Sequence, residues 1–217
     1  MTAILEMKEI SKVFGEKKVL DQVNLRVPEK SIFGFVGKNG SGKTTTMNII
    51  LGLLEASGGE VFVCGEKVKY GETKTNRHIG YLPDVPAFYD YMTAMEYLRL
   101  CGEISGLHKT KSVEKAGELL DLVGLKDEQE KIMTFSRGMK QRLGLAQALI
   151  NEPKLLICDE PSSALDPIGR KKILDILLSI KGKTTVLFSS HILSDIERVC
   201  DRVAFLDKGC IQVQGGI

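Results

Sequence analysis

The stretch Gly37-Lys-Asn-Gly-Ser-Gly-Lys-Thr44 decides how this chain folds. It fits the pattern G-x-x-x-x-G-K-[S/T], with an apolar run of strand length before it (31–36) and a helical pattern after it (44–54). The glycines allow backbone N–H groups to curl around a phosphate without Cβ clashes, and the N-terminus of the following helix adds partial positive charge there. The stretch therefore predicts a strand, a phosphate-binding loop and a helix in direct succession.

This loop is the Walker A pattern of nucleotide-binding proteins, and it predicts roles for individual side chains. Lys43 is expected to reach the β- and γ-phosphates, and the Thr44 hydroxyl is expected to bind Mg²⁺. The loop residues expected to contact ATP are Gly37, Lys38, Asn39, Gly40, Ser41, Gly42, Lys43, Thr44 and Thr45. The alternative is an incidental glycine-rich turn, which the flanking strand and helix disfavour. Because kinases, GTPases, helicases and transport ATPases all carry this pattern, other motifs must distinguish these classes.

A second apolar run, 155–158, ends in two carboxylates, Asp159 and Glu160. Ligands bind at the carboxyl ends of parallel strands, so these charges are predicted to face the nucleotide. Asp159 suits a Mg²⁺-binding role, often through water, and Glu160 suits a catalytic role in which it polarises the attacking water. The alternative is that the two acidic residues only cap a helix at the end of the strand. The presence of the phosphate loop disfavours this alternative.

Short β-branched runs alternate with longer helical patterns in the second half of the chain. A further strand is predicted at 186–190, and helices are predicted at 167–180 and 193–200. This alternation indicates an α/β fold, with a parallel sheet covered on both faces. The two ends of the chain indicate antiparallel pairing instead, because strand patterns separated by turn residues occur at 4–13, 23–27, 60–64, 203–206 and 211–213.

The middle of the chain, 88–149, carries mostly helical patterns. Apolar side chains recur there at helical spacing, and Gly124 ends that helix; the repeating positions are Val113, Ala116, Leu119, Leu120 and Val123. We therefore expect a single domain, 1–217, in which a helical subdomain at 88–149 is inserted into a parallel-sheet core. The core and its antiparallel β-subdomain are expected to comprise 1–87 and 150–217.

The composition is that of an ordinary globular protein, with 43% hydrophobic and 27% charged residues among 217. The net charge of +2 lacks the clear excess of basic residues that is typical of nucleic-acid-binding proteins, so no nucleic-acid partner is expected. The basic run Arg170-Lys171-Lys172 is interpreted as a solvated helix face. The five cysteines form no CxxC pair and no signal peptide is apparent, which predicts reduced thiols in the cytosol. No window reaches the roughly 18 consecutive apolar residues of a spanning helix, so membrane association is expected to require a partner.

Further motifs follow the phosphate loop in a characteristic order. Phe135-Ser-Arg-Gly-Met-Lys-Gln-Arg142 resembles the signature motif of the ABC (ATP-binding cassette) family, Ser163-Ala-Leu-Asp166 resembles its D-loop, and Ser189-Ser-His191 resembles its switch histidine. Phe14 stands where the family stacks an aromatic side chain on adenine. The order and spacing suit the family over essentially the whole chain. The resemblance implies the P-loop NTPase fold of ABC ATPases and Mg²⁺-dependent hydrolysis of ATP.

The resemblance also implies a head-to-tail dimer, in which each ATP lies between the phosphate loop of one copy and the signature motif of the other. Ser136 and the backbone N–H of Gly138 are then expected to contact the γ-phosphate across the interface, and Asp166 is expected to cross it. His191 is expected to hydrogen-bond both the γ-phosphate and Glu160. The catalytic residues implied are Glu160, His191 and Lys43.

Three of these assignments have plainer alternatives. Phe14 is alternatively an aromatic residue of the core, and His191 a structural histidine at a strand end. Ser136 is alternatively a helix N-cap, a position from which its hydroxyl can also face a phosphate.

The chain departs from the family pattern at Asp84, where the family usually has Gln. An ionised Asp only accepts hydrogen bonds and is one methylene shorter, yet it remains a candidate ligand of ATP and of Mg²⁺ or its water. The signature is also altered, with Phe135, Arg137 and Met139 in place of Leu, Gly and Gln. Both departures resemble the drug and lantibiotic exporters of the ABC-2 branch.

We therefore expect the ATP-hydrolysing subunit of an exporter, held at the cytoplasmic face of the cell membrane by a separate transmembrane permease. Its other expected partner is a second copy of itself or a related ATPase subunit. The loop that contains Asp84, Tyr89 and Tyr91 is expected to contact the permease. The alternatives are a non-transport ABC ATPase of translation or DNA repair, and another P-loop enzyme such as a small-molecule kinase. Only 93 positions, without a heptad run, separate Lys43 from Ser136, which argues against the coiled-coil insertion of the non-transport class.

Overall fold

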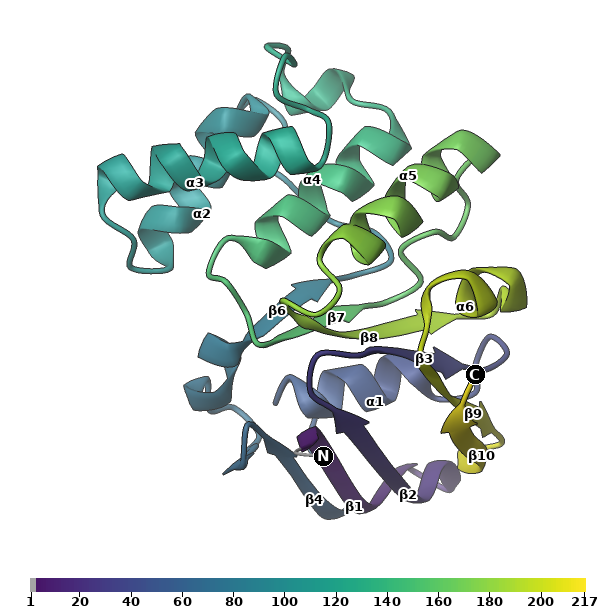
Figure 1. Ribbon diagram of the computed structural model, residues 1–217. Coiled ribbons are helices and arrows are strands. Elements are labelled where there is room, and N and C mark those ends of the chain that lie inside the picture. Colours follow the sequence, from purple (N-terminus) through teal and green to yellow (C-terminus); the bar gives the residue numbers. More distant parts are fainter. Residues whose placement is uncertain (1–2) are drawn as a thin grey trace.

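The computed structural model describes residues 3–217 and contains two sheets with helices between and above them (Figure 1). A six-stranded sheet in the order β10-β9-β3-β8-β7-β6 crosses the middle, and a four-stranded antiparallel sheet in the order β2-β1-β4-β5 lies below it in this view. Helix α1 (Lys43–Ile50) lies between the two sheets, and the other long helices lie above the six-stranded sheet. The predicted α/β fold with an antiparallel β-subdomain is confirmed.

The strands of the six-stranded sheet are β3 (Ile32–Val36), β6 (Ile79–Leu82), β7 (Leu155–Cys158), β8 (Thr185–Ser190), β9 (Arg202–Asp207) and β10 (Cys210–Gly216). Adjacent strands are parallel except β9 and β10, which form an antiparallel hairpin. The two C-terminal strands thus pair with each other as predicted, but they extend the parallel sheet, because β9 lies beside β3. β6 is not among the predicted strands: its sequence, Ile-Gly-Tyr-Leu, lacks the continuous apolar run that marks β7.

The antiparallel sheet consists of β1 (Ala3–Phe14), β2 (Lys17–Pro28), β4 (Gly58–Val63) and the short β5 (Glu66–Lys67). β1 pairs with both β2 and β4, so it occupies the centre of the sheet. The β1–β2 hairpin brings Phe14 opposite Lys17 in a tight turn, where Gly15 adopts a φ of +56°. This turn leaves Phe14 at the rim of the molecule.

The two faces of β3 belong to two different hydrophobic cores. Ile32 and Val36 pack among the helices above the sheet, whereas Phe33 and Phe35 pack with α1 and the antiparallel sheet. Successive side chains of a strand point to opposite faces, so a strand buried on both sides is a continuous apolar run, as it is in this sequence. The phosphate loop follows directly from this strand, and both cores therefore fix its position.

The helices above the sheet are α2 (Ala94–Ile104), α3 (Lys109–Leu122), α4 (Arg137–Leu149), α5 (Pro167–Ser179) and α6 (Leu193–Val199). Two short 3-10 helices, η1 (Lys74–His78) and η2 (Ile132–Thr134), precede β6 and α4. One prediction needs correction. Helix α1 ends at Ile50 and not at residue 54, because the chain turns at Gly52 with a φ of +69°. Of the five apolar positions with helical spacing before Gly124, Val113 is 43% exposed and the other four are buried.

Helices α2, α3 and α4 form the upper lobe in Figure 1, which meets the sheet where α4 packs on β6. Two glycines allow this close approach. A Cβ at Gly80 would overlap the carbonyl oxygen of Ala148, and a Cβ at Gly144 would lie 2.8 Å from Leu82 Cδ1. The lobe shares one continuous core with the upper face of the sheet. The limits 88 and 149 for a helical subdomain stay a prediction.

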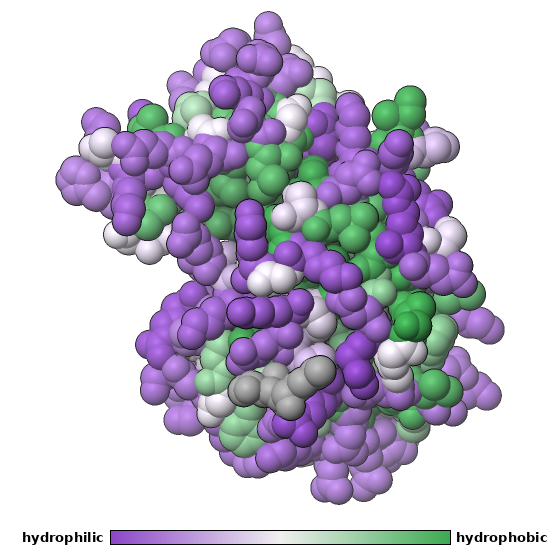
Figure 2. Space-filling model, in the orientation of Figure 1, coloured by the Kyte–Doolittle hydropathy of each residue, from purple (hydrophilic) through white to green (hydrophobic). Residues whose placement is uncertain are grey.

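The surface of the molecule is mostly polar on the side that Figure 2 shows, where hydrophilic side chains cover much of the lower half. Within residues 3–217, no helix combines the length and the apolarity needed to cross a membrane.

The contact of β6 with α4 gives a stability test. Gly80→Ala is expected to lower the free energy of unfolding by about 1–3 kcal/mol, because the new methyl group is forced against the α4 backbone. Gly117→Ala in α3 is the matched control: its Cβ meets nothing within 4 Å, and alanine should stabilise the helix by up to about 1 kcal/mol. Denaturant unfolding of both variants measures the difference. Equal stabilities would show that β6 and α4 are not in close contact.

Candidate functional site

The phosphate loop joins the end of β3 to the start of α1. Gly42 is the N-cap of α1 with a φ of 110°, a conformation that favours glycine. Gly37 lies so close to Ser41 Oγ and to the carbonyl oxygen of Leu206 that a Cβ would overlap both. The loop is closed by a hydrogen bond from the Ser41 N–H to the Lys38 carbonyl oxygen, at 3.1 Å. Lys38, Asn39, Gly40 and Thr44 are exposed, whereas Gly37 and Thr45 are half-buried.

Lys43 places its ammonium group inside this loop. Its Nζ donates to the carbonyl oxygens of Gly37 at 2.6 Å and Lys38 at 3.2 Å. It also forms an ion pair of 3.2 Å with Glu160 Oε1, and the two side chains are only 6% and 13% exposed. Ser41 Oγ is buried nearby without a hydrogen-bond partner among the described residues. The loop thus presents a desolvated cation and a free hydroxyl, the groups that a phosphate would satisfy.

Asp159 and Thr44 meet at the ends of β7 and the phosphate loop. The Thr44 hydroxyl donates to Asp159 Oδ2 at 2.7 Å, and the Ser189 hydroxyl on β8 donates to Asp159 Oδ1 at 2.7 Å. Asp159 is 3% exposed. Buried carboxylates need such partners, because an unpaired one is costly to desolvate. The sequence predicts that Thr44 and Asp159 each bind Mg²⁺. It predicts no role for Ser189, which is marked only by its place two residues before His191.

Glu160 is held from three sides. Its N–H donates to Ser189 Oγ at 2.8 Å, its Oε2 lies 2.8 Å from His191 Nδ1, and its Oε1 faces Lys43. Its backbone has a φ of 49°, in the left-handed region that is uncommon for residues other than glycine. Such a conformation persists only where the surroundings fix it. The structure therefore brings Lys43, Glu160 and His191 together, as the sequence predicts.

Asp84 lies two residues beyond β6 and faces the same carboxylates. Burial is the main cause that raises the pKa of its carboxyl group; Asp159 and Glu160 add to the increase, while Arg137 and His191 oppose it. Its Oδ1 is 3.8 Å from Arg137 Nη2. Two of the departures from the family pattern, Asp84 and Arg137, are thus neighbours, which neither motif reveals alone.

The signature motif begins helix α4. Ser136 is its N-cap and accepts a hydrogen bond from the Met139 N–H at 3.3 Å, which confirms the capping alternative. Gly138 has open space around it: a Cβ at this position would have Leu165 Cδ2, at 4.0 Å, as its nearest neighbour. Asp166 caps α5 by accepting from the Gly169 N–H at 3.3 Å. Ser136, Arg137, Gly138, Leu165 and Asp166 line one surface cavity, apart from the phosphate loop.

Phe14 is 48% exposed, so the alternative that it belongs to the core is wrong. Lys12 Nζ lies 4.9 Å from the centre of its ring, a cation–π contact that holds the ring at the end of β1. A stacking role for this ring stays a prediction.

The oxygen atoms near the loop fit a Mg²⁺–nucleotide complex. The Thr44 hydroxyl and the Asp159 carboxylate are hard oxygen donors in direct contact with each other. Within the described part of the chain, no group of three or more His, Cys, Asp or Glu side chains forms a metal site by itself. This agrees with the usual way of holding Mg²⁺, in which one or two protein oxygens act together with the phosphates and water.

Comparison with known proteins gives the family. The sequence profile described as "ABC transporter" matches residues 20–163. The chain belongs to the ABC transporter family. It is 45% identical over 213 residues to the "Uncharacterized ABC transporter ATP-binding protein YxlF" of Bacillus subtilis (strain 168), covering 98% of this chain and 70% of that protein. It is 40% identical over 212 residues to the "Bacitracin transport ATP-binding protein BcrA" of Bacillus licheniformis, covering 96% and 68%.

Solved structures agree with this assignment. The chain matches an ATP-binding subunit of an ABC transporter with a TM-score of 0.88 and 32% identity, over 99% of this chain and 90% of that one. It matches the ATP-binding cassette MJ0796, described as a dimer in a post-hydrolysis state with ADP and Pi, with a TM-score of 0.87 and 26% identity over 98% of both chains. The chain is an ATP-binding subunit and an ATPase of the ABC type, as the motifs predicted. These relatives do not favour the non-transport alternative.

The position of Ser189 between the two acidic residues gives a test of this geometry. Ser189→Ala removes the hydroxyl that binds Asp159 and accepts from Glu160, and should lower the free energy of unfolding by about 1–3 kcal/mol. Ser190→Ala is the control, since this equally buried hydroxyl accepts one bond, from the Ile192 N–H at 3.0 Å. The control should cost about 1 kcal/mol. If both variants unfold at the same denaturant concentration, Ser189 does not bridge the two acidic residues.

Proposed function

We propose that the chain hydrolyses Mg²⁺–ATP with Glu160 as the general base and His191 as its orienting partner. The observation that carries this proposal is the contact of Glu160 with the buried Lys43 at 3.2 Å and with the exposed His191 at 2.8 Å. One oxygen of the Glu160 carboxylate, Oε1, faces the Lys43 ammonium group at 3.2 Å. The contact with His191 Nδ1 fixes the direction of the carboxylate. These are the requirements of a group that polarises a water molecule.

On the phosphate side of the site, Lys43 would bind the phosphate oxygens and Thr44 would help to hold Mg²⁺. Binding of ATP would give Lys43 phosphate oxygens in place of the carbonyl oxygens of Gly37 and Lys38, and would bring the free hydroxyl of Ser41 into use. Thr44 and Asp159 would hold Mg²⁺, with Asp84 as a further candidate; the cation neutralises charge on the β- and γ-phosphates. The rest of the loop, 37–45, would supply backbone N–H groups.

The working form that we propose is a head-to-tail dimer with a second copy or a related ATPase subunit. Ser136 and Gly138 are accessible, next to the N-terminus of α4, and a helix N-terminus attracts phosphate. In one copy they line a cavity apart from the phosphate loop, which supports a role toward the ATP of a partner. Asp166 lines the same cavity, and the exposed ring of Phe14 is free to stack on adenine. The dimeric state of the solved relative also supports this arrangement.

Glu160→Gln tests both the base and the dimer. The amide keeps the shape of the side chain but cannot take the proton, so kcat should fall roughly 10²- to 10⁴-fold while ATP still binds. The slow variant should then elute as a dimer when Mg²⁺ and ATP are present. Glu152→Gln is the control: this exposed carboxylate binds Lys115 and should leave hydrolysis unchanged. Wild-type turnover of Glu160→Gln would remove Glu160 as the base, and a strictly monomeric variant would count against ATP-driven dimerisation.

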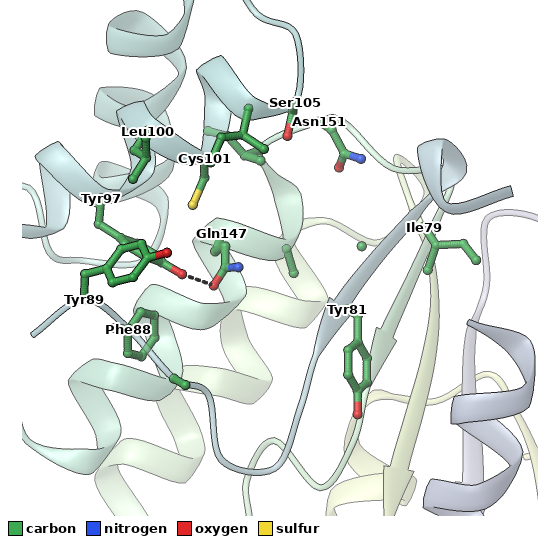
Figure 3. Close-up of a pocket in the computed structure, with 15 residues that line it drawn as sticks. Ile79, Tyr81, Phe88, Tyr89, Tyr97, Leu100, Cys101, Ser105, Gln147 and Asn151 are labelled. Atoms are coloured by element: carbon green, nitrogen blue, oxygen red, sulfur yellow. Dashed lines mark hydrogen bonds between the residues drawn. The ribbon is translucent and has the colours of Figure 1, made fainter. Parts of the chain in front are cut away.

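We further propose that a transmembrane permease docks in a groove between β6 and the helical lobe. The cavity measures about 660 Å³ and is lined by side chains of β6, α2, α4 and the loop before α2. In Figure 3 the aromatic rings of Phe88, Tyr89 and Tyr97 gather on one side, and Tyr97 donates to Gln147 at 3.0 Å. Exposed aromatic residues around an apolar groove are typical of protein interfaces. A short amphipathic segment of the permease fits this chemistry.

The comparisons and the sequence also support a branch of the family and a location. The bacitracin transport protein of Bacillus licheniformis is a relative over nearly the whole chain, and Asp84 and the altered signature resemble drug and lantibiotic exporters. These points support an exporter. The permease would then hold the subunit at the cytoplasmic face of the membrane.

The groove proposal is tested by Tyr89→Ala, which removes a ring that lines the groove, combined with Tyr91→Ala, which removes the ring whose centre is 6.0 Å from that of Tyr89. Both rings are on the surface, 53% and 68% exposed, so basal hydrolysis should stay near wild type. Stimulation by the reconstituted permease in lipid should be lost, since large aromatic side chains often dominate binding energy at interfaces. Tyr70→Ala is the matched control, because Tyr70 is 62% exposed and does not line the groove. Stimulation equal to wild type in the double variant would exclude the groove as the docking surface.

A further inference from the structure

A row of side-chain contacts joins the two segments that follow β7 and β8. Three contacts between side chains link the segment 159–162 to the segment 189–195: Ser189 with Asp159 at 2.7 Å, His191 with Glu160 at 2.8 Å, and Ser162 with Asp195 at 2.7 Å. The first two belong to the site already described. The third lies further from the phosphate loop and involves a carboxylate outside that site.

Asp195 is an almost fully buried acidic residue, 2% exposed, in the first turn of α6. Both of its oxygen atoms are used. Oδ2 accepts a hydrogen bond from the Ser162 hydroxyl, and Oδ1 accepts one from Arg170 Nε at 2.6 Å. Arg170 also donates to Ser194 Oγ at 2.8 Å. A buried carboxylate with this many partners is costly to remove or to move, so Asp195 fixes what it binds.

The segment that Asp195 binds has an unusual backbone. Glu160 has a φ of 49° and Ala164 a φ of 53°, so two residues other than glycine adopt the left-handed conformation within five positions. Ser162 lies midway between them and is 2% exposed. Arg170 is in α5, one turn beyond its N-cap Asp166. The two oxygen atoms of Asp195 therefore hold the middle of this segment and the helix into which it leads.

We propose that Asp195 is a positioning residue for ATP hydrolysis. Its carboxylate holds Ser162 and Arg170, and thereby keeps the segment 160–166 in the conformation that directs Glu160 toward His191. The proposal rests on the proposed function of Glu160 as the base. It predicts a change in the chemical step more than in ATP binding, because neither Ser162 nor Asp195 is part of the phosphate loop.

Ser162→Ala and Asp195→Asn are the test variants. Ser162→Ala removes one contact and leaves the pair of Asp195 with Arg170 intact; Asp195→Asn removes the charge that Arg170 needs. Each should lower kcat roughly ten- to a hundredfold, the usual effect of a small misplacement of a catalytic group, with KM for ATP within about twofold. Hydrogen exchange of the 160–166 backbone should be faster in both. Affinity for a fluorescent ATP analogue should be unchanged.

Asp175→Asn is the matched control. Asp175 pairs with Arg198 at 2.7 Å and joins the same two helices, α5 and α6, but it is 48% exposed and does not reach Ser162. This control should keep the wild-type kcat. If Asp195→Asn does not fold, the kcat of Ser162→Ala alone tests the proposal. A folded Ser162→Ala variant with lower thermal stability but wild-type kcat would overturn the proposal. Wild-type turnover of Glu160→Gln in the same assay would instead overturn the proposed function on which it rests.

Discussion

The buried ion pair of Lys43 with Glu160 is the constraint on which the rest of the site depends. The two charged atoms are 3.2 Å apart and almost without solvent, so neither can be left alone without a large desolvation cost. Lys43 follows β3 and Glu160 follows β7, and β8 lies between these strands in the sheet. The pair therefore forms only if the three strands end at the same level. Ser189 at the end of β8 fills the gap and binds Asp159 and the Glu160 N–H.

Charged side chains extend from the phosphate loop toward the start of α4. Lys43 already uses backbone carbonyl oxygens of its own loop, and phosphate oxygens are stronger partners for an ammonium group. If the Lys43 ammonium group moved, the electrostatic field at Glu160 would change. Glu160 is in turn in contact with His191. Asp84 faces the same carboxylates and lies near Arg137 at the start of α4.

The sequence predicted the parts of the site that depend on short, strict patterns. A loop that must surround a phosphate needs its glycines and its lysine at fixed spacing, so Gly37 to Thr44 could be recognised at once, as could the strand that ends in Asp159 and Glu160. Contacts between distant segments leave no such pattern. Ser162 and Asp195 are 33 positions apart, and only the parallel pairing of β7 with β8 brings them together. Val113 has helical spacing with its neighbours but lies at the edge of the apolar stripe, where periodicity alone does not decide burial. The attachment of the C-terminal hairpin to β3 likewise follows from tertiary packing.

A crystal structure of the protein with Mg²⁺ and a non-hydrolysable ATP analogue tests the central claim most directly. We expect the β- and γ-phosphates to occupy the loop 37–45, with Lys43 Nζ on the phosphate oxygens and no longer on the Gly37 carbonyl oxygen. Mg²⁺ should contact the Thr44 hydroxyl, and Asp159 should lie within reach of the cation or its water molecules. Glu160 should keep its contact with His191 and face the γ-phosphate. Phosphates bound outside the loop, or a Glu160 that turns away from the γ-phosphate, would contradict the account.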